Sequence, residues 1–222
     1  MVVHIGRYRP SLEYRDGGAT NERVIVQALH PNVITAYALP RRAVNTVTLM
    51  VGFALLTAVA AQIRIPIPGT PIAITGQTFG VLLAGAALGS RIGAGSMLVY
   101  VSLGAIGLPF FAGGESGWTY ATGASFGYLL GFVVAAWLIG RLAEQRRDRT
   151  VVTAVPAFLA GSAAIYTLGV TWLWVTVEAI PTFNGALHAG LYPFLVGDLT
   201  KAVAAGLLLP GAWYLVDRTT GS

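Results

Sequence analysis

The chain has 222 residues, of which 55% are hydrophobic and only 10% are charged, and its mean hydropathy is +0.68. This composition excludes a soluble domain with a single anchor and predicts an all-α integral membrane protein. The net charge of +5 comes mainly from arginines at the ends of apolar segments, which orient membrane proteins and indicate no nucleic-acid partner, while the absence of cysteine excludes disulfides and cysteine metal sites.

The first 40 residues mix charges, glycine and proline with apolar runs that are too short to cross a membrane. They begin with a polar stretch and lack an apolar core followed by small residues, so a cleaved signal peptide is not expected. We expect residues 1–40 to form a cytoplasmic N-terminal extension that is largely disordered or associated with the surface. Residues 41–218 are predicted to form a compact bundle of six transmembrane helices.

The first predicted span runs from about Ala43 to Ile63. Its small residues Gly52, Ala54, Ala58 and Ala61 recur at helical spacing, so one face of the helix permits the close approach of another backbone. This face could pack against the chain's own helices or against another protein, and the sequence leaves both alternatives open. Ala54 and Ala58 are therefore candidates for a partner interface.

A proline-rich segment, IRIPIPGTPIAIT, follows at residues 63–75. Proline at this density forbids a regular helix, and non-helical backbone at membrane depth persists only where protein covers it or a cavity hydrates it. We therefore expect a lid or a cavity wall here. The next run, from Gln77 to Leu88, is too short to cross upright. A short helix beside a broken segment points towards a binding site, with Gln77 as a candidate ligand contact.

The third predicted span, from about Ile92 to Gly107, leads into a loop rich in glycine and aromatic residues. This loop, residues 108–123, reads LPFFAGGESGWTYATG. Glycine lets the backbone approach a ligand and aromatic rings offer flat apolar faces, although an aromatic belt at the membrane interface would use the same residues. The fourth span covers about Ser125 to Leu142, and the fifth begins near Val151 and ends by Val177.

The distribution of arginine predicts the orientation. Every arginine except Arg64 lies in the N-terminal tail, in the turn between the second and third spans, in the loop between the fourth and fifth, or at the C-terminus. Because positive residues favour the cytoplasmic side, we expect six helices with both termini in the cytoplasm. The proline-rich segment and the aromatic loop then lie on the outer side.

The sixth predicted span, from Tyr192 to Val216, carries two opposite charges. Asp198 and Lys201 are three residues apart, which places them on one face of a helix, and Lys201 is the only lysine in the chain. Because an unpaired charge inside a membrane is costly, such a pair is by default a ligand or ion site that faces the bundle interior. The alternative is a structural ion pair that fixes the helix register.

Motifs of catalysis and nucleotide binding are absent from the sequence. It contains no GxxxxGK[ST], GxSxG or HExxH, and its three histidines, His4, His30 and His188, lie far apart. We therefore expect no enzyme activity, no catalytic residues, no metal site and no cofactor. Any ATP-driven step would have to come from another protein.

Three stretches together carry a family resemblance. They are IPIPGTPIAITGQTFGVLLAGAALGSRIGAGSMLVYVSLGAIGLPFFAGG at residues 65–114, TGASFGYLLGF at 122–132 and PFLVGDLTKA at 193–202. The chain resembles the BioY family, the biotin-binding S components of energy-coupling factor (ECF) transporters, over about residues 43–216. The resemblance implies a six-helix protein of a bacterial or archaeal cell membrane that captures biotin from the outer side. It also implies partners, either a transmembrane T component with two ATPase subunits or further copies of the chain itself.

The resemblance implies the positions of biotin contacts. These are Asp198 and Lys201, the tyrosine Tyr128, and the glycine-rich turn Gly113, Gly114 and Glu115. Asp198 could accept from a ureido N–H of biotin, and Lys201 could donate to the ureido carbonyl or to the carboxylate. The aromatic residues Trp118, Tyr120 and Tyr128 could cover the ring.

Two alternative functions stay open from the sequence. The chain could be an S component of the same architecture for another small vitamin. It could also be a solitary proton-coupled or facilitative carrier, in which Asp198 would relay the proton.

Overall fold

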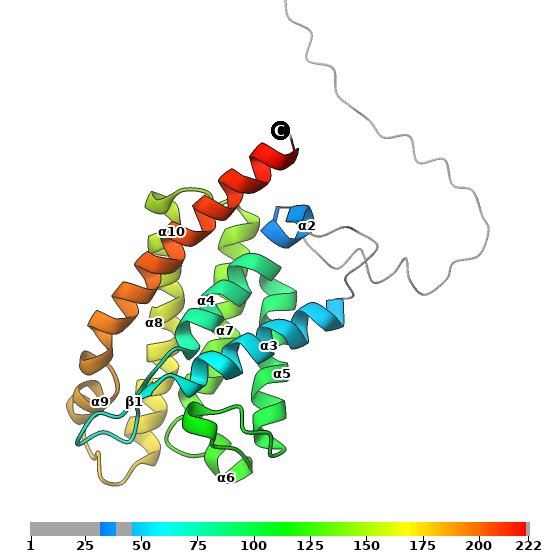
Figure 1. Ribbon diagram of the computed structural model, residues 1–222. Coiled ribbons are helices and arrows are strands. Elements are labelled where there is room, and N and C mark those ends of the chain that lie inside the picture. The colour runs from blue at the N-terminus through cyan, green and yellow to red at the C-terminus, as the bar shows by residue number, and fades with distance from the viewer. Residues whose placement is uncertain (1–31, 39–45, 221–222) are drawn as a thin grey trace, which may run out of the picture.

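The computed structural model describes residues 32–38 and 46–220. These residues are mostly helical, in agreement with the apolar composition (Figure 1). The longer helices are α3 (Thr46–Gln62), α4 (Gln77–Leu88), α5 (Ser90–Ala105), α7 (Phe126–Glu144), α8 (Val151–Thr176) and α10 (Leu195–Thr220). The shorter elements are α2 (Ile34–Ala38), α6 (Trp118–Ala121), α9 (Phe183–Gly190) and the 3-10 turns η1 (Ala112–Gly114) and η2 (Tyr192–Phe194).

Three stretches of the described chain are long and apolar enough to cross a membrane. They are Phe126–Glu144, Val151–Thr176 and Phe183–Tyr214, and two shorter apolar helices, Thr46–Gln62 and Gln77–Leu88, accompany them. A helix as short as α4 rises only about 18 Å, less than the hydrocarbon thickness of about 30 Å. The chain is therefore a helical multi-pass membrane protein, and the number of six crossings stays a prediction.

Helix α7 packs closely against its neighbours α4, α5 and α8. A Cβ atom at Gly131 of α7 would lie 2.8 Å from the Cα atom of Ile165 on α8, and one at Gly85 of α4 would lie 2.7 Å from the carbonyl oxygen of Ala136 on α7. Only glycine permits such an approach of two backbones. These contacts fix the positions of α4, α7 and α8, which form walls of one cavity.

Three of the four small residues of α3, Ala54, Ala58 and Ala61, pack inside the protein, while Gly52 is exposed. Ala54 and Ala58 are buried members of the hydrophobic core. A Cβ atom at Gly80 of α4 would lie 2.7 Å from the Thr57 hydroxyl, which shows how closely α3 and α4 approach. The prediction of a partner interface at Ala54 and Ala58 is therefore corrected, because the chain's own helices use this face. The outward face of α3 carries larger residues such as Val59.

The proline-rich segment forms a hairpin instead of a helix. Strand β1 (Arg64–Ile65) pairs antiparallel with β2 (Ile74–Thr75), with Arg64 opposite Thr75. In the connection between the strands, the hydroxyl of Thr70 donates to the carbonyl oxygen of Ala189 on α9, at 2.5 Å. The hairpin thus reaches from the end of α3 to α9, along one end of the bundle (Figure 1).

Residues 32–38 pack against the bundle, so the predicted domain boundary at residue 40 lies too late. Val33 is fully buried, and the hydroxyl of Thr35 donates to the carbonyl oxygen of Ala87 at the end of α4, at 2.7 Å. Asn32 Nδ2 donates to the backbone oxygen of Glu144 at 2.9 Å. Helix α2 contacts α4 and α10. The remainder of the predicted extension, 1–31 and 39–40, lies outside the described residues.

The loop between α7 and α8 contains a buried carboxylate. Asp148 is only 2% exposed, and its Oδ2 accepts from the Trp213 indole N–H of α10 at 2.7 Å. The guanidinium carbon of Arg149 lies 3.4 Å from the centre of a Trp213 ring, a cation–π contact. Burial raises the pKa of Asp148 above its ordinary value. This cluster joins the loop to the second half of α10.

Candidate functional site

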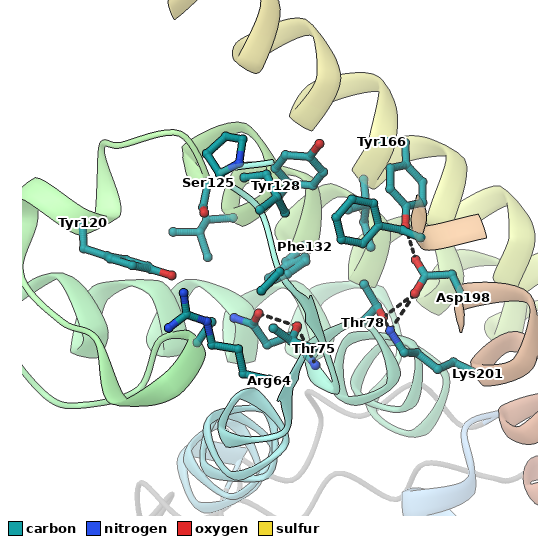
Figure 2. A pocket seen from close by; sticks show the side chains of 18 residues that line it. Arg64, Thr75, Thr78, Tyr120, Ser125, Tyr128, Phe132, Tyr166, Asp198 and Lys201 are labelled. Atoms are coloured by element: carbon teal, nitrogen blue, oxygen red, sulfur yellow. Dashed lines mark hydrogen bonds and ion pairs between the residues drawn. The ribbon is translucent and has the colours of Figure 1, made fainter. Parts of the chain in front are cut away.

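A cavity lies between the hairpin, the loop that carries α6, and helices α4, α7, α8 and α10 (Figure 2). It contains about 680 Å³ free of protein atoms, its opening to solvent included. The polar lining residues are Arg64, Thr75, Gln77, Thr78, Tyr120, Ser125, Tyr128, Tyr166, Asp198 and Lys201, and the apolar ones are Pro71, Ile72, Ala73, Ala112, Leu129, Phe132, Ile165 and Phe194.

Asp198 and Lys201 lie on the first turns of α10, at one end of the cavity (Figure 2). Lys201 Nζ donates to Asp198 Oδ1 at 2.7 Å and to the hydroxyl oxygen of Thr78 on α4 at 3.0 Å. The Thr78 hydroxyl donates to the same Oδ1 at 3.1 Å, and the Tyr166 hydroxyl of α8 donates to Oδ2 at 2.5 Å. Three helices therefore hold a carboxylate that is only 5% exposed.

The structural ion pair that the sequence offered as an alternative is present beside a cavity, and ligand binding by this pair stays a prediction. The ammonium and the carboxylate form an internal ion pair, and both side chains also line the cavity. An ammonium group has three N–H donors, of which Asp198 and Thr78 take two. The third N–H of Lys201 can therefore donate to a ligand without breaking the ion pair.

A second cation lies at the opposite end of the cavity. Arg64 on β1 and Tyr120 on α6 occupy this end, and Phe132 lies between them and the charge pair (Figure 2). The Tyr120 ring stacks on Phe111 with 5.3 Å between the ring centres. Burial raises the pKa of Tyr120, so its phenol stays neutral. A guanidinium beside a neutral hydroxyl is well suited to bind a carboxylate.

Gln77 lies on the cavity wall, and its amide is part of a buried chain of hydrogen bonds. The Thr75 hydroxyl donates to Gln77 Oε1 at 2.7 Å, and Gln77 Nε2 donates to the Tyr100 hydroxyl at 2.5 Å. Tyr100 then donates to the carbonyl oxygen of Phe110 at 3.0 Å. This series of hydrogen bonds links the hairpin, α4, α5 and the loop after α5. It fixes the wall of the cavity, and a direct contact of Gln77 with a ligand stays a prediction.

Tyr128 contributes an aromatic ring to the cavity wall from α7. Its hydroxyl donates to the carbonyl oxygen of Gly190 on α9 at 2.8 Å, so this group is occupied within the protein. A side chain at Gly169 of α8 would collide with the Tyr128 ring, which therefore depends on this glycine for its place. The ring lies beside Ser125 and Phe132 in the cavity, where it can cover an apolar part of a ligand (Figure 2).

Four of the predicted site residues do not line the cavity. Gly113 and Gly114 have positive φ angles of 74° and 82°, and with Glu115 they form an exposed turn after Phe111. Trp118 is 71% exposed, on the face of α6 away from Tyr120. The predicted role of Trp118 as a cover for the ligand is corrected, because the direction of α6 brings Tyr120 and not Trp118 to the cavity.

The glycine turn has an indirect relation to the cavity. A Cβ atom at Gly113 would lie 3.0 Å from both Cδ and Nη1 of Arg64. Gly113 therefore leaves space for the guanidinium at the cavity mouth. Gly113, Gly114 and Glu115 are placed beside the site and not in it.

Sequence reasoning missed several lining residues. Arg64 had a usable signal, since it is the one arginine outside the predicted cytoplasmic segments. Thr78 follows Gln77 directly and could have been included with it. Tyr166 had no such signal, because a tyrosine within a long apolar helix has many structural explanations.

Comparisons with known proteins point to one family. A sequence model of the BioY family matches residues 31–218. Two curated relatives are the biotin transporter BioY of Rhodobacter capsulatus, 39% identical over 163 residues, and the biotin transporter BioY of Thermotoga maritima, 38% identical over 156 residues. The alignments cover 70% of this chain in both cases, and 85% and 88% of the relatives.

A solved structure is similar to the described fold. It is the crystal structure of an S component for biotin from an ECF-type ABC transporter, with a TM-score of 0.68 and 25% sequence identity. The match covers 74% of this chain and 88% of that chain.

Proposed function

The chain belongs to the BioY family, and from this premise we propose that it captures biotin at the outer side of a cell membrane for uptake. The cavity that lies between the hairpin, α6 and four long helices is the proposed binding site. The described residues offer donors, acceptors and aromatic faces in this cavity, and the sequence carries no catalytic motif. Binding and transport, without chemistry on the ligand, is the function that these groups support.

The observation that carries the proposal is the placement of charges at two ends of one cavity. Lys201 and Asp198 lie at one end and Arg64 at the other (Figure 2). Two cations and one anion favour a ligand with a single negative charge. Biotin has a neutral ureido head, an apolar ring and chain, and a distant carboxylate, so its polar groups are separated in the same manner.

The proposed orientation of biotin in the cavity follows from the hydrogen-bond donors and acceptors of the lining residues. Asp198 accepts a ureido N–H, and the third N–H of Lys201 donates to the ureido carbonyl oxygen. Tyr128 and Phe132 cover the apolar ring, and Arg64 with Tyr120 binds the carboxylate at the mouth. This orientation assigns Lys201 to the head of biotin, because Arg64 provides a separate site for the carboxylate.

Calorimetry on the purified protein tests which ligand it binds. Biotin, dethiobiotin, lipoate and thiamine are titrated separately into the full chain in detergent. We expect saturable binding of biotin with a 1:1 ratio, weaker binding of dethiobiotin and none of thiamine. If the chain bound thiamine or lipoate more tightly than biotin, the proposed ligand would be wrong, and the chain would be an S component for another small vitamin.

We propose that transport depends on an ECF module with a transmembrane T component and two ATPase subunits. The absence of a GxxxxGK[ST] motif supports this, because the chain has no such means of binding ATP. We also propose six membrane crossings with both termini in the cytoplasm, which the arginine distribution supports. Biotin uptake into cells that express the chain with and without the module tests the dependence, and uptake driven by the proton gradient alone would favour a solitary carrier.

A further inference from the structure

The two oxygens of the buried Asp198 carboxylate have different partners. Oδ1 accepts from two donors, Lys201 Nζ and the Thr78 hydroxyl. Oδ2 accepts from the Tyr166 hydroxyl at 2.5 Å. Because each carboxylate oxygen can accept about two hydrogen bonds, Oδ1 is saturated and Oδ2 has one acceptor position left. A ligand N–H therefore has one place to bind on this carboxylate.

Tyr166 is held in place by its aromatic neighbours. Its ring meets Tyr128 edge to face, with 6.3 Å between the centres and 88° between the planes. The ring of Phe194 also lies near it, with 6.5 Å between the centres. The direction of the Tyr166 hydroxyl is thus fixed by packing between α7, α8 and η2. Asp198 itself stands on α10, so the bond between them joins two separate helices.

Tyr166 and Asp198 also separate the cavity from a second hollow. This groove lies between α8, α9 and α10 and is lined mainly by apolar residues such as Leu159, Val170, Leu187 and Leu195. Both Tyr166 and Asp198 line the groove as well as the cavity. Among the described residues, only Tyr166 donates a side-chain hydrogen bond to Oδ2. Without its hydroxyl, Oδ2 would border an apolar groove and the carboxylate could rotate.

We propose that Tyr166 is a positioning residue that fixes the plane of the Asp198 carboxylate and so presents the remaining acceptor of Oδ2 to a ligand N–H. Thr78 and Lys201 hold Oδ1 from one side, and Tyr166 holds Oδ2 from the other. The ligand then meets an acceptor that is already oriented, and no binding energy is needed to order it. The inference rests on the proposed function, because it assigns the ureido N–H of biotin to Asp198.

Tyr166→Phe removes the hydroxyl and keeps the ring. We expect this change to weaken biotin binding by about tenfold or more, because a hydrogen bond to a buried charge is lost and the acceptor must be ordered on binding. The matched control is Tyr214→Phe, the same change on the far half of α10 at an exposed tyrosine. The control should bind biotin as the wild type does.

A double-mutant cycle distinguishes positioning from general destabilisation. If Tyr166 acts through the carboxylate, Tyr166→Phe should cost less than about twofold in affinity when Asp198→Asn is already present. Equilibrium binding of radiolabelled biotin over a wide concentration range measures all four proteins. An additive cost of the two substitutions, or an unchanged affinity of Tyr166→Phe, would overturn the inference.

Infrared difference spectroscopy tests the inference without a ligand. The carboxylate stretching band that is absent in Asp198→Asn identifies Asp198, and we expect this band to shift in Tyr166→Phe and to stay in place in Tyr214→Phe. A band that does not shift would overturn the positioning role. Failure of the wild type to bind biotin, together with a shifted band, would overturn the proposed function while leaving the bond between Tyr166 and Asp198 supported.

Discussion

Two buried aspartates, Asp198 in the first half of α10 and Asp148 against its second half, differ in their surroundings. Asp198 is 5% exposed and accepts from Thr78, Tyr166 and Lys201. Asp148 is 2% exposed, and its Oδ2 accepts from Trp213, while among the described residues its Oδ1 has no hydrogen-bond partner. Asp198 lines the candidate cavity and Asp148 does not.

The difference shows that burial of a charge does not by itself indicate a binding site. Asp148 is the more deeply buried of the two, and its contact with Trp213 fastens a loop to a helix. Asp198 has a hydrogen-bond network around it, a cavity beside it and a cation with a donor to spare. These features together identify the candidate site, and each of them can be removed by substitution.

The largest effect should come from substitution of the charge pair itself. Asp198→Asn and Lys201→Met should each weaken biotin binding by several hundred-fold, because loss of one partner of a buried ion pair costs about 3 to 5 kcal/mol. Asp148→Asn is the matched control at the other aspartate, and it should leave the affinity unchanged. Calorimetry on the three variants measures their affinities for biotin. Equal losses of affinity at Asp198 and Asp148 would contradict the distinction drawn between the two aspartates.

A smaller effect is expected at the far end of the cavity. Arg64→Gln should weaken biotin binding by about tenfold, since a charge-assisted hydrogen bond is lost at an exposed position where solvent screens it. The same substitution should leave the affinity for biotin methyl ester unchanged, because the ester lacks the carboxylate. Arg141→Gln, at an exposed arginine near the end of α7, is the control. If Arg64→Gln weakened binding of the ester by the same factor, Arg64 would not be the residue that binds the carboxylate.

The aromatic loop allows a finer test of what borders the cavity. Tyr120→Ala should weaken biotin binding by about fivefold, because a half-buried ring that covers the ligand is lost. Trp118→Ala should change the affinity by less than about twofold, since this ring is exposed away from the cavity. Calorimetry on the two variants tests the assignment, and the reverse order of losses would contradict the placement of α6.

The smallest effect concerns the stability at Asp148. Burial raises the pKa of the folded carboxyl above the ordinary value of 3.8, so the folded state binds more protons than the unfolded state in the interval between the two values. The free energy of unfolding should therefore fall as the pH rises through that interval. Asp148→Asn removes this dependence while keeping an acceptor for Trp213.

At neutral pH we expect Asp148→Asn to raise the melting temperature, because the buried carboxyl that resists ionisation is replaced by a neutral amide. Thermal unfolding in detergent at several pH values, followed for the wild type and the variant, measures the difference. A variant that melts earlier than the wild type at neutral pH would show that the charge of Asp148, through its attraction to the charge of Arg149, stabilises the protein.

Much of the helical layout could be predicted from hydropathy and from the positions of proline and glycine. The apolar run from Gln77 to Leu88 coincides with α4, and the run from Val151 coincides with α8 to within one residue at its end. The hairpin could not be predicted, because two strands of two residues leave no periodic pattern. The packing of residues 32–38 was missed because Val33 and Thr35 meet parts of the chain that are distant in sequence.

Residues of the candidate cavity could be predicted from the sequence where a residue type is unusual for its surroundings. A carboxylate and the only lysine within an apolar helix indicated Asp198 and Lys201. Tyr166 lies 32 residues from Asp198 in the sequence, and only the packing of α8 against α10 brings them together. The distinction between Trp118 and Tyr120 depends on the direction of a four-residue helix. That direction is set by the turns before it, which include Gly113, Gly114 and Gly117 with positive φ angles.

Helix α2 also bears on the order in which the protein is assembled. It is the first described element to leave the ribosome, yet its neighbours include α4 and α10, and α10 is the last to be synthesised. At about 5 to 20 residues per second, the wait between the two is on the order of ten seconds or more. Helix α2 must remain without its α10 neighbours throughout that time, so the first of the described helices is among the last of them to complete its packing.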